Sequence, residues 1–187
     1  MTPESVETRA AALLLAYGDK TPRVALDAFV APGSVIVGDV EIASGASIWF
    51  NCTLRADEAA IRIGVGSNLQ DGTVVHVHGR KQGTTIGSDV TVGHMVLLHA
   101  CTLEDGAYVG MGALVMDEAV IEGGAMLAAG AMLTQRKRVP RGELWGGRPA
   151  RMMRRLAPEE WEQLSRTAAN YAERAQQFLR QMRVAPP

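Results

Sequence analysis

Only two cysteines, Cys52 and Cys101, occur among the 187 residues of the chain. Two thiols cannot build the disulfide framework of a small secreted domain, so a reducing compartment, the cytoplasm, is expected. The formal net charge of −1 offers no attraction to nucleic acid or to an anionic membrane. The apolar run A-A-A-L-L-L-A-Y at residues 10–17 is too short to span a membrane, and its leader is too acidic for a secretory signal.

Aromatic residues are also few, with three each of Phe, Trp and Tyr, so the core must be aliphatic. Residues 1–21 are expected to form a separate N-terminal segment. A short helix is predicted within it, with Thr2 as its cap, Pro3 in its first turn and Gly18 beyond its end.

A six-residue repeat dominates the sequence over residues 22–153. Examples are V-A-P-G-S-V from Val30, L-Q-D-G-T-V from Leu69 and V-G-M-G-A-L from Val109. An aliphatic residue leads each unit, the fourth residue is often Gly, and the fifth is small. Such short strands, separated by tight corners, stack as a coil of parallel strands. A β-sandwich is disfavoured because its turns fall every 8–12 residues.

The period is interrupted three times: three residues are added between 54 and 63, five between 75 and 86, and one is missing between 98 and 103. The added residues are expected to bulge outward as loops. After the repeat, residues 157–183 are predicted to form a helix that packs along the coil or on a neighbouring subunit. It begins near Pro158, and its apolar positions recur with helical spacing.

Folding the chain at 18 residues per coil aligns two histidines. From Val75 to Leu98 is 23 residues, and removing the five added residues leaves 18, so His76 and His99 share one column. Arg55 falls one coil below His76 by the same count. His94 lies on a different face, above Gln70 and Asp71. His78 shares no column and is interpreted as a surface residue.

Two stacked imidazoles suit a metal ion, but zinc in catalytic sites usually has three protein ligands and a water. His94 of a neighbouring copy would complete the set, which predicts three equivalent sites between three chains about a threefold axis. Arg55 of one chain would then face Asp71 of the next. Cys52 and Cys101 are interpreted as packing residues, with Cys101 a less favoured fourth ligand.

Several motifs together resemble the γ-class carbonic anhydrases over Pro22–Arg151. They are G-D-V-E-I-A-S-G-A-S-I-W, L-R-A-D-E, I-G-V-G-S-N-L-Q-D-G-T-V-V-H, V-G-H-M-V-L-L-H, V-G-M-G-A-L-V-M-D and L-W-G-G-R-P-A-R. The resemblance implies a mainly β fold, a left-handed parallel β-helix of hexapeptide repeats with a C-terminal α-helix. It also implies a homotrimer that binds zinc, or alternatively iron or cobalt, at its subunit interfaces.

The resemblance also assigns roles to single residues. His76 and His99 match the two metal ligands of one subunit, and His94 matches the ligand from its neighbour. Gln70 matches the residue that orients metal-bound water. The remaining matches are a pocket amide, Asn68, a carboxylate near the metal, Glu58, and residues of interface ion pairs, Arg55, Asp57 and Asp71. Tyr171, on the predicted helix, is a further candidate for the pocket.

The expected reaction is the reversible hydration of carbon dioxide by a carbonic anhydrase-like lyase. Gln70 would hold the hydroxide, and Glu58 would accept the proton. The loop G-R-K-Q-G-T-T at residues 79–85 contains no carboxylate, whereas the active members resembled here carry an acidic loop, so low activity is expected. Two alternatives stay open: a coenzyme A-linked acyltransferase or thioesterase, with Gln135–Arg138, Arg151, Arg154 and Arg155 meeting phosphates, and a metal-binding trimeric scaffold without turnover.

Overall fold

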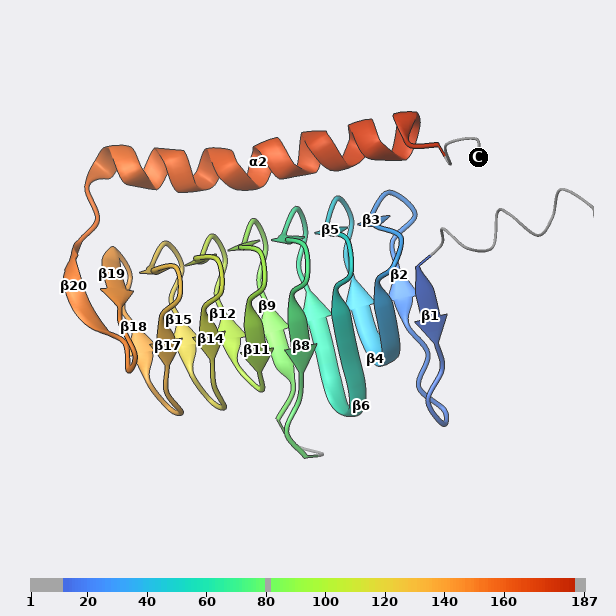
Figure 1. Ribbon diagram of the computed structural model, residues 1–187, viewed down its shortest axis with the longest axis horizontal. Coiled ribbons are helices and arrows are strands. Elements are labelled where there is room, and N and C mark those ends of the chain that lie inside the picture. The colour runs from blue at the N-terminus through green and yellow to red at the C-terminus, as the bar shows by residue number, and fades with distance from the viewer. Residues whose placement is uncertain (1–11, 80–81, 184–187) are drawn as a thin grey trace, which may run out of the picture.

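The computed structural model describes residues 12–79 and 82–183. Short parallel strands stack into one long coil, and a single helix runs along it (Figure 1). The elements are β1 Leu13–Leu15, β2 Arg23–Val24, β3 Phe29–Val30, β4 Val35–Ile42, β5 Ser47–Ile48, β6 Thr53–Ile63, β7 Asn68–Leu69, β8 Val74–His76, β9 Thr84–Ile86, β10 Thr91–Val92, β11 Leu97–His99, β12 Thr102–Leu103, β13 Tyr108–Val109, β14 Leu114–Val115, β15 Val120–Ile121, β16 Met126–Leu127, β17 Met132–Leu133, β18 Arg138–Val139, β19 Glu143–Gly146, β20 Arg151–Arg155 and α2 Pro158–Gln181.

The strands form three faces, which confirms the predicted parallel β-helix. One face runs β17-β14-β11-β8-β6, the second runs β6-β9-β12-β15-β18, and the third runs β20-β19-β16-β13-β10-β7-β5-β3. Strand β6 turns the corner between the first two faces, because its first residues pair with β8 and its last residues pair with β9. Tyr108 pairs with Met126 on the next coil, 18 positions on, as the repeat requires.

The leading aliphatic residues fill the interior of the coil. Leu69, Val92 and Val109 are fully buried, and the small residues at the fifth positions, such as Ala46 and Ala113, are buried beside them. Each fully buried Val, Leu or Ile stabilises the fold by roughly 1.5–3 kcal/mol relative to exposure. The interior of the coil is therefore an aliphatic ladder, as the small number of aromatic residues predicts.

The three added residues after Leu54 bulge from the coil as expected, but they do so within a strand and not as a separate loop. They lengthen β6 into a continuous strand, and its register with β4 shifts where Gly38 pairs with Ala56 and Val40 pairs with Ile61. Gly38 is required at this bulge, since it has a φ of +80° and an added Cβ would lie 2.2 Å from the carbonyl oxygen of Ala56. Before β9, His78 and Gln82 form an antiparallel bridge that closes the segment leaving the coil, and residues 80–81 between them lie outside the described residues.

The predicted N-terminal helix falls largely on residues 1–11, which lie outside the described residues. Its expected end is wrong, because Leu13–Leu15 form strand β1 and pair in parallel with Val35–Val37 of β4. Strand β4 has an open edge near the end of the coil. Pairing of residues 13–15 with this edge outweighs the helix propensity of the Ala and Leu residues.

Helix α2 packs along the coil of its own chain, against β3, β5, β7 and β10. Ala168 and Ala175 are buried where the helix approaches closest. Phe178 and Tyr171 pack edge-on against Trp49, with ring centroids 5.1 and 5.4 Å away. The helix therefore covers the third face. No helix among the described residues is long and apolar enough to cross a lipid bilayer.

Glu160 ties the start of α2 to β20. Its carboxylate accepts two hydrogen bonds from Arg154, at 2.7 and 2.8 Å, and one from the Ala157 N–H at 2.8 Å. The bonds from Arg154, and then that from Ala157, lower the pKa of Glu160 to about 2. The stabilisation is complete above the ordinary pKa of 4.5 and is lost as the pH falls towards 2.

We expect Glu160→Gln to lower Tm by a few degrees at pH 6 and by much less at pH 2.5, where the wild-type carboxylate is partly protonated. Thermal unfolding followed by circular dichroism at both pH values measures this difference. Glu162→Gln is the control, because Glu162 makes only an exposed pair with Arg166 at 3.3 Å. An equal loss of Tm at both pH values would contradict the assigned role.

Candidate metal centre

His76 and His99 lie side by side on the first face of the coil. They end strands β8 and β11 and pair directly in the parallel register, and the Nδ1 of His76 is 3.2 Å from the Nε2 of His99. Arg55 pairs with His76 from the coil below. The column of Arg55, His76 and His99 expected from the 18-residue count is therefore present.

The spacing of the two imidazole nitrogens fits one metal ion. Two nitrogens bound tetrahedrally to zinc at 2.0–2.1 Å lie about 3.3 Å apart, close to the 3.2 Å observed. Both side chains are only partly exposed, so they need little rearrangement to act as a ligand pair. The spacing of this nitrogen pair thus fits a zinc-type ion.

A carboxylate holds the outer nitrogen of each imidazole. Asp57 lies 3.1 Å from the Nε2 of His76, and Asp117 lies 2.5 Å from the Nδ1 of His99. Burial alone would raise the pKa of Asp57, but hydrogen bonding from His76 and the adjacent Arg55 guanidinium together hold it below its ordinary value. Carboxylates in this position orient metal-binding histidines and increase their basicity.

The sequence did not single out Asp117. The repeat after Leu98 is one residue short, so Leu98 pairs with Val115 and the column of His99 continues to Met116. Asp117 stands one residue outside that column, and only its acidic character next to the column could have indicated it. His78 is 64% exposed, as predicted for a surface residue, yet its Nδ1 lies 3.4 Å from Asp117.

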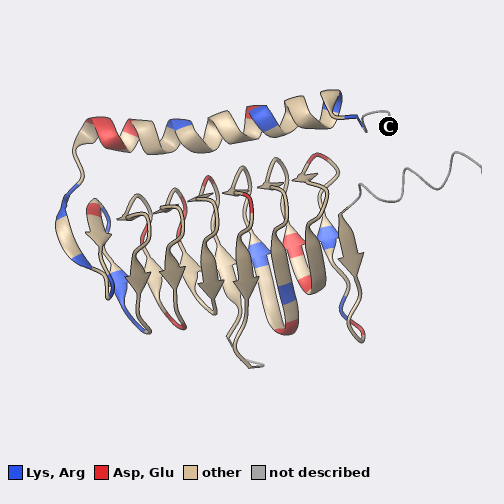
Figure 2. Ribbon diagram, viewed as in Figure 1, with Lys and Arg blue, Asp and Glu red and all other residues tan. Residues whose placement is uncertain are grey.

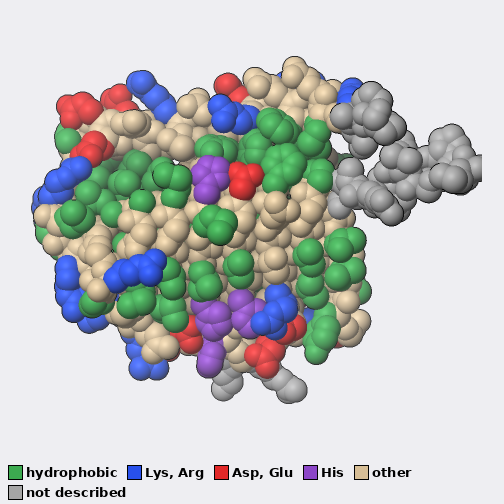
Figure 3. Space-filling view, viewed as in Figure 1, with side chains coloured by type: hydrophobic (Ala, Val, Ile, Leu, Met, Phe, Trp, Pro, Cys, Tyr) green, Lys and Arg blue, Asp and Glu red, His purple; other side chains and the backbone are tan. Residues whose placement is uncertain are grey.

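His94 lies apart from this pair. It follows β10 on another face, and its Nδ1 is 2.8 Å from Asp71 of the coil below. Figure 3 shows histidine side chains at two separate places on one side of the molecule. His78, His99 and Asp117 form the only group of three potential ligands within reach of one another in the described part of the chain, so His94 does not join His76 and His99 within one chain.

Arg55 and Asp71, expected to face each other across an interface, have partners within the chain. Arg55 pairs with Asp57, and Asp71 pairs with His94. Glu58 accepts a hydrogen bond from the Gly79 N–H at 2.9 Å, so its carboxylate connects the middle of β6 to the segment that follows β8.

Two buried amides lie beneath α2 on the third face. Gln70 donates to the Oδ1 of Asn68 at 3.2 Å, and Asn68 donates to the Oγ1 of Thr91 at 3.0 Å. Tyr171 lies nearby on α2, against Trp49, and burial raises its pKa, with a smaller opposing effect of Arg174. Asn68, Gln70 and Tyr171 are therefore on the same side of the molecule as the Asp71–His94 pair.

Cys52 and Cys101 are both free and buried, in agreement with their predicted packing role.

Positive charge is concentrated around β18–β20 (Figure 2). Much of it is already neutralised, because Arg136 pairs with Glu118, Arg138 with Glu104 and Glu122, and Arg154 with Glu160. These contacts favour a charged rim over a phosphate-binding site.

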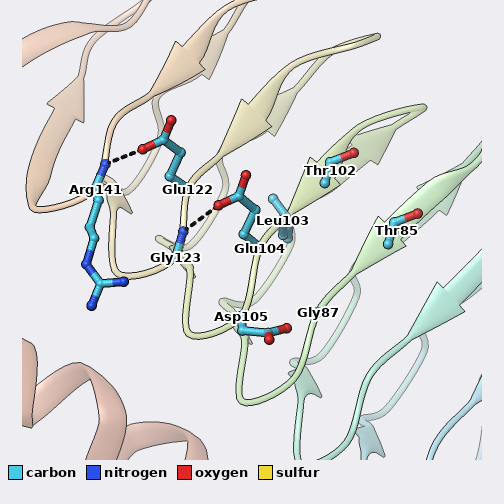
Figure 4. A pocket seen from close by; sticks show the side chains of 9 residues that line it. All are labelled: Thr85, Gly87, Thr102, Leu103, Glu104, Asp105, Glu122, Gly123 and Arg141. Carbon is cyan, nitrogen blue, oxygen red and sulfur yellow. Dashed lines mark hydrogen bonds between the residues drawn. The ribbon is translucent and has the colours of Figure 1, made fainter.

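A groove of about 510 Å³ lies on the second face and contains no histidine (Figure 4). The carboxylates in this groove accept hydrogen bonds from backbone N–H groups. Glu104 accepts one from Gly123, Glu122 one from Arg141, and Asp105 one from Ser88. These bonds tie successive coils together, so the groove is a feature of the scaffold.

The sequence and the fold are both similar to those of known proteins. The chain is 49% identical over 163 residues to γ carbonic anhydrase 2 of Arabidopsis thaliana mitochondria, covering 84% of this chain and 59% of that protein. It is 37% identical over 175 residues to a carbonic anhydrase of Geobacillus kaustophilus, covering 92% and 96% of the two chains. The chain thus spans about 59% of the plant relative's length.

Among solved structures, a hexapeptide transferase family protein of Anaplasma phagocytophilum matches with a TM-score of 0.86 and 47% identity, covering 89% of this chain and 98% of that one. A solved N-acyltransferase is only 13% identical, which shows a shared fold alone. No model of a protein family matches the sequence. The identity to the curated relatives, and the coverage of nearly the whole Geobacillus protein, establish the relationship: this chain belongs to the γ-carbonic anhydrase family.

Proposed function

We propose that the protein catalyses the reversible hydration of carbon dioxide to bicarbonate. The observation that carries this proposal is the His76–His99 pair, with nitrogens 3.2 Å apart and an outer carboxylate on each ring. Relatives named carbonic anhydrase over most of the chain supply the reaction class. A bound metal ion contributes by lowering the pKa of water from 15.7 to about 7, which provides hydroxide at neutral pH.

We further propose that the ion is zinc and that His94 of a neighbouring copy is its third ligand. Imidazole nitrogens suit zinc, iron and cobalt, and three histidines are a common catalytic zinc set. His94 is 40% exposed on its side chain and Asp71 fixes its ring, so His94 is available to a second chain. A cyclic trimer would repeat one interface three times, and Arg55 and Asp71 would lie near it.

The remaining site residues act on substrate and protons. The Gln70 carbonyl oxygen would accept a hydrogen bond from the hydroxide and so orient it towards carbon dioxide. Glu58, an exposed residue of β6 three positions after Arg55, would accept the proton released from water. Asn68 and Tyr171 would line the substrate pocket beside Gln70. Asn68 is hydrogen-bonded to Gln70 beneath α2, and Tyr171 is on α2 itself. The cytoplasmic location remains a prediction, supported by the two free buried thiols.

Because the loop at residues 79–85 has no carboxylate, we expect a low catalytic rate, and the alternative is a metal-binding scaffold without turnover. Stopped-flow hydration of carbon dioxide, on reduced protein with its metal quantified, tests the proposal directly. We expect hydration by the metal-loaded wild type, and loss of both metal and hydration in His99→Ala. His78→Ala is the histidine control and should keep both.

Full metal content without hydration would favour the scaffold and overturn the catalytic proposal. The acyltransferase alternative has its own assay, retention on a coenzyme A matrix. We expect no retention, because the arginines it would use are largely paired within the chain.

A further inference from the structure

The orientation of the Asn68 amide is fixed by its surroundings. Its Nδ2 lies 3.4 Å from the Val90 carbonyl oxygen and 3.0 Å from the Oγ1 of Thr91. A carbonyl oxygen can only accept a hydrogen bond, so the amide group of Asn68 must turn its NH₂ towards β10. The Val90 carbonyl also accepts the Asn68 backbone N–H at 2.9 Å, so its bond to the side-chain NH₂ is long and shared. This carbonyl sets the polarity of the amide, and the closer Thr91 hydroxyl, which can accept or donate, adds the shorter bond that holds the amide in place.

This orientation determines the polarity of Gln70. With its NH₂ facing Thr91, Asn68 presents Oδ1 to Gln70, and the Gln70 NH₂ donates to it at 3.2 Å. One N–H of the Gln70 amide is thereby engaged, which turns its NH₂ towards Asn68 and its Oε1 away from Asn68. Thr91, Asn68 and Gln70 are at most 5% exposed, so water has little access to substitute for a missing partner.

We propose that Thr91 is a positioning residue that acts through Asn68 to make Gln70 a hydrogen-bond acceptor towards the reacting oxygen. This inference rests on the proposed hydration reaction. A hydroxide has one proton to donate and needs an acceptor to fix its orientation. If the Asn68 amide were free to flip, Gln70 would flip with it and present NH₂ in place of Oε1.

Thr91→Val tests the role of the hydroxyl, because valine keeps the branched shape and removes the acceptor. In the zinc-loaded oligomer we expect kcat/KM for carbon dioxide to fall about tenfold, as for the loss of one orienting hydrogen bond. Zinc content should not change. Thr91→Ser retains the hydroxyl and should recover most of kcat/KM. Thr73→Val is the matched control, because the Thr73 hydroxyl bonds only to the Gly93 carbonyl at 3.1 Å.

A second measurement does not depend on activity. Hydrogen exchange of the Gln70 side-chain NH₂, followed by NMR, should be slow in the wild type and in Thr91→Ser and at least tenfold faster in Thr91→Val. Unchanged kcat/KM and unchanged exchange in Thr91→Val would overturn the inference, as would equal losses in Thr91→Ser and Thr91→Val. Absence of hydration in the wild type would overturn the proposed function, and with it the catalytic part of this inference, while the exchange data would still decide whether Thr91 fixes the two amides.

Discussion

Oligomers assembled from equal amounts of His76→Ala and His94→Ala chains are expected to recover about a quarter of the wild-type hydration rate, although each variant alone is inactive. In the proposed interface one chain supplies His76 and His99 and its neighbour supplies His94. An interface is complete only when a His94→Ala chain provides the pair and a His76→Ala chain provides His94. With random cyclic assembly, about one interface in four meets this condition.

The measurement is stopped-flow hydration and zinc content of co-expressed, differently tagged chains. Purification through both tags removes the unmixed trimers, and the expected recovery then rises to about a third, because each mixed trimer has one complete interface in three. Mixing His76→Ala with His99→Ala provides the matched control, because both residues belong to the same side of the interface and no pairing restores a complete site. Zinc binding and hydration by His94→Ala alone, at the wild-type level, would refute the shared site.

Replacing Asp117 by Asn is expected to weaken zinc binding about 10- to 100-fold. Asp117 lies 2.5 Å from the Nδ1 of His99, so the substitution can keep a hydrogen-bond acceptor there while it removes the negative charge. The other carboxylate oxygen, 3.4 Å from the Nδ1 of His78, becomes an NH₂ group. The neutral amide supports a less basic imidazole, and the Nε2 of His99 becomes a weaker ligand. Competition with a chromogenic chelator measures the affinity.

Asp105→Asn is the control for this substitution. Asp105 also accepts a single short hydrogen bond, from the Ser88 N–H at 2.7 Å, but on the second face away from the histidines. We expect its zinc affinity to equal that of the wild type. Equal affinities in Asp117→Asn and wild type would show that Asp117 has no part in the metal centre.

The sequence predicted the coil and the column of Arg55, His76 and His99. In a parallel β-helix with a constant period, a spacing along the chain becomes a distance in space, because each coil adds one strand about 4.8 Å above the last. The count of 18 residues therefore placed His76 against His99, and it also placed His94 above Asp71. Such an inference requires only the period and the lengths of the insertions.

Contacts outside the repeat, and the directions of side chains, could be found only from the tertiary structure. Asp117 stands one residue outside the column, and only the path of the shortened coil brings its carboxylate to His99. The polarity of Gln70 depends on a chain of side-chain hydrogen bonds through Asn68 to Thr91. Leu13–Leu15 form a strand because a distant edge, Val35–Val37, is open to them. Side-chain direction and non-local pairing depend on the assembled fold, whereas the repeat determines only the order in which its coils stack.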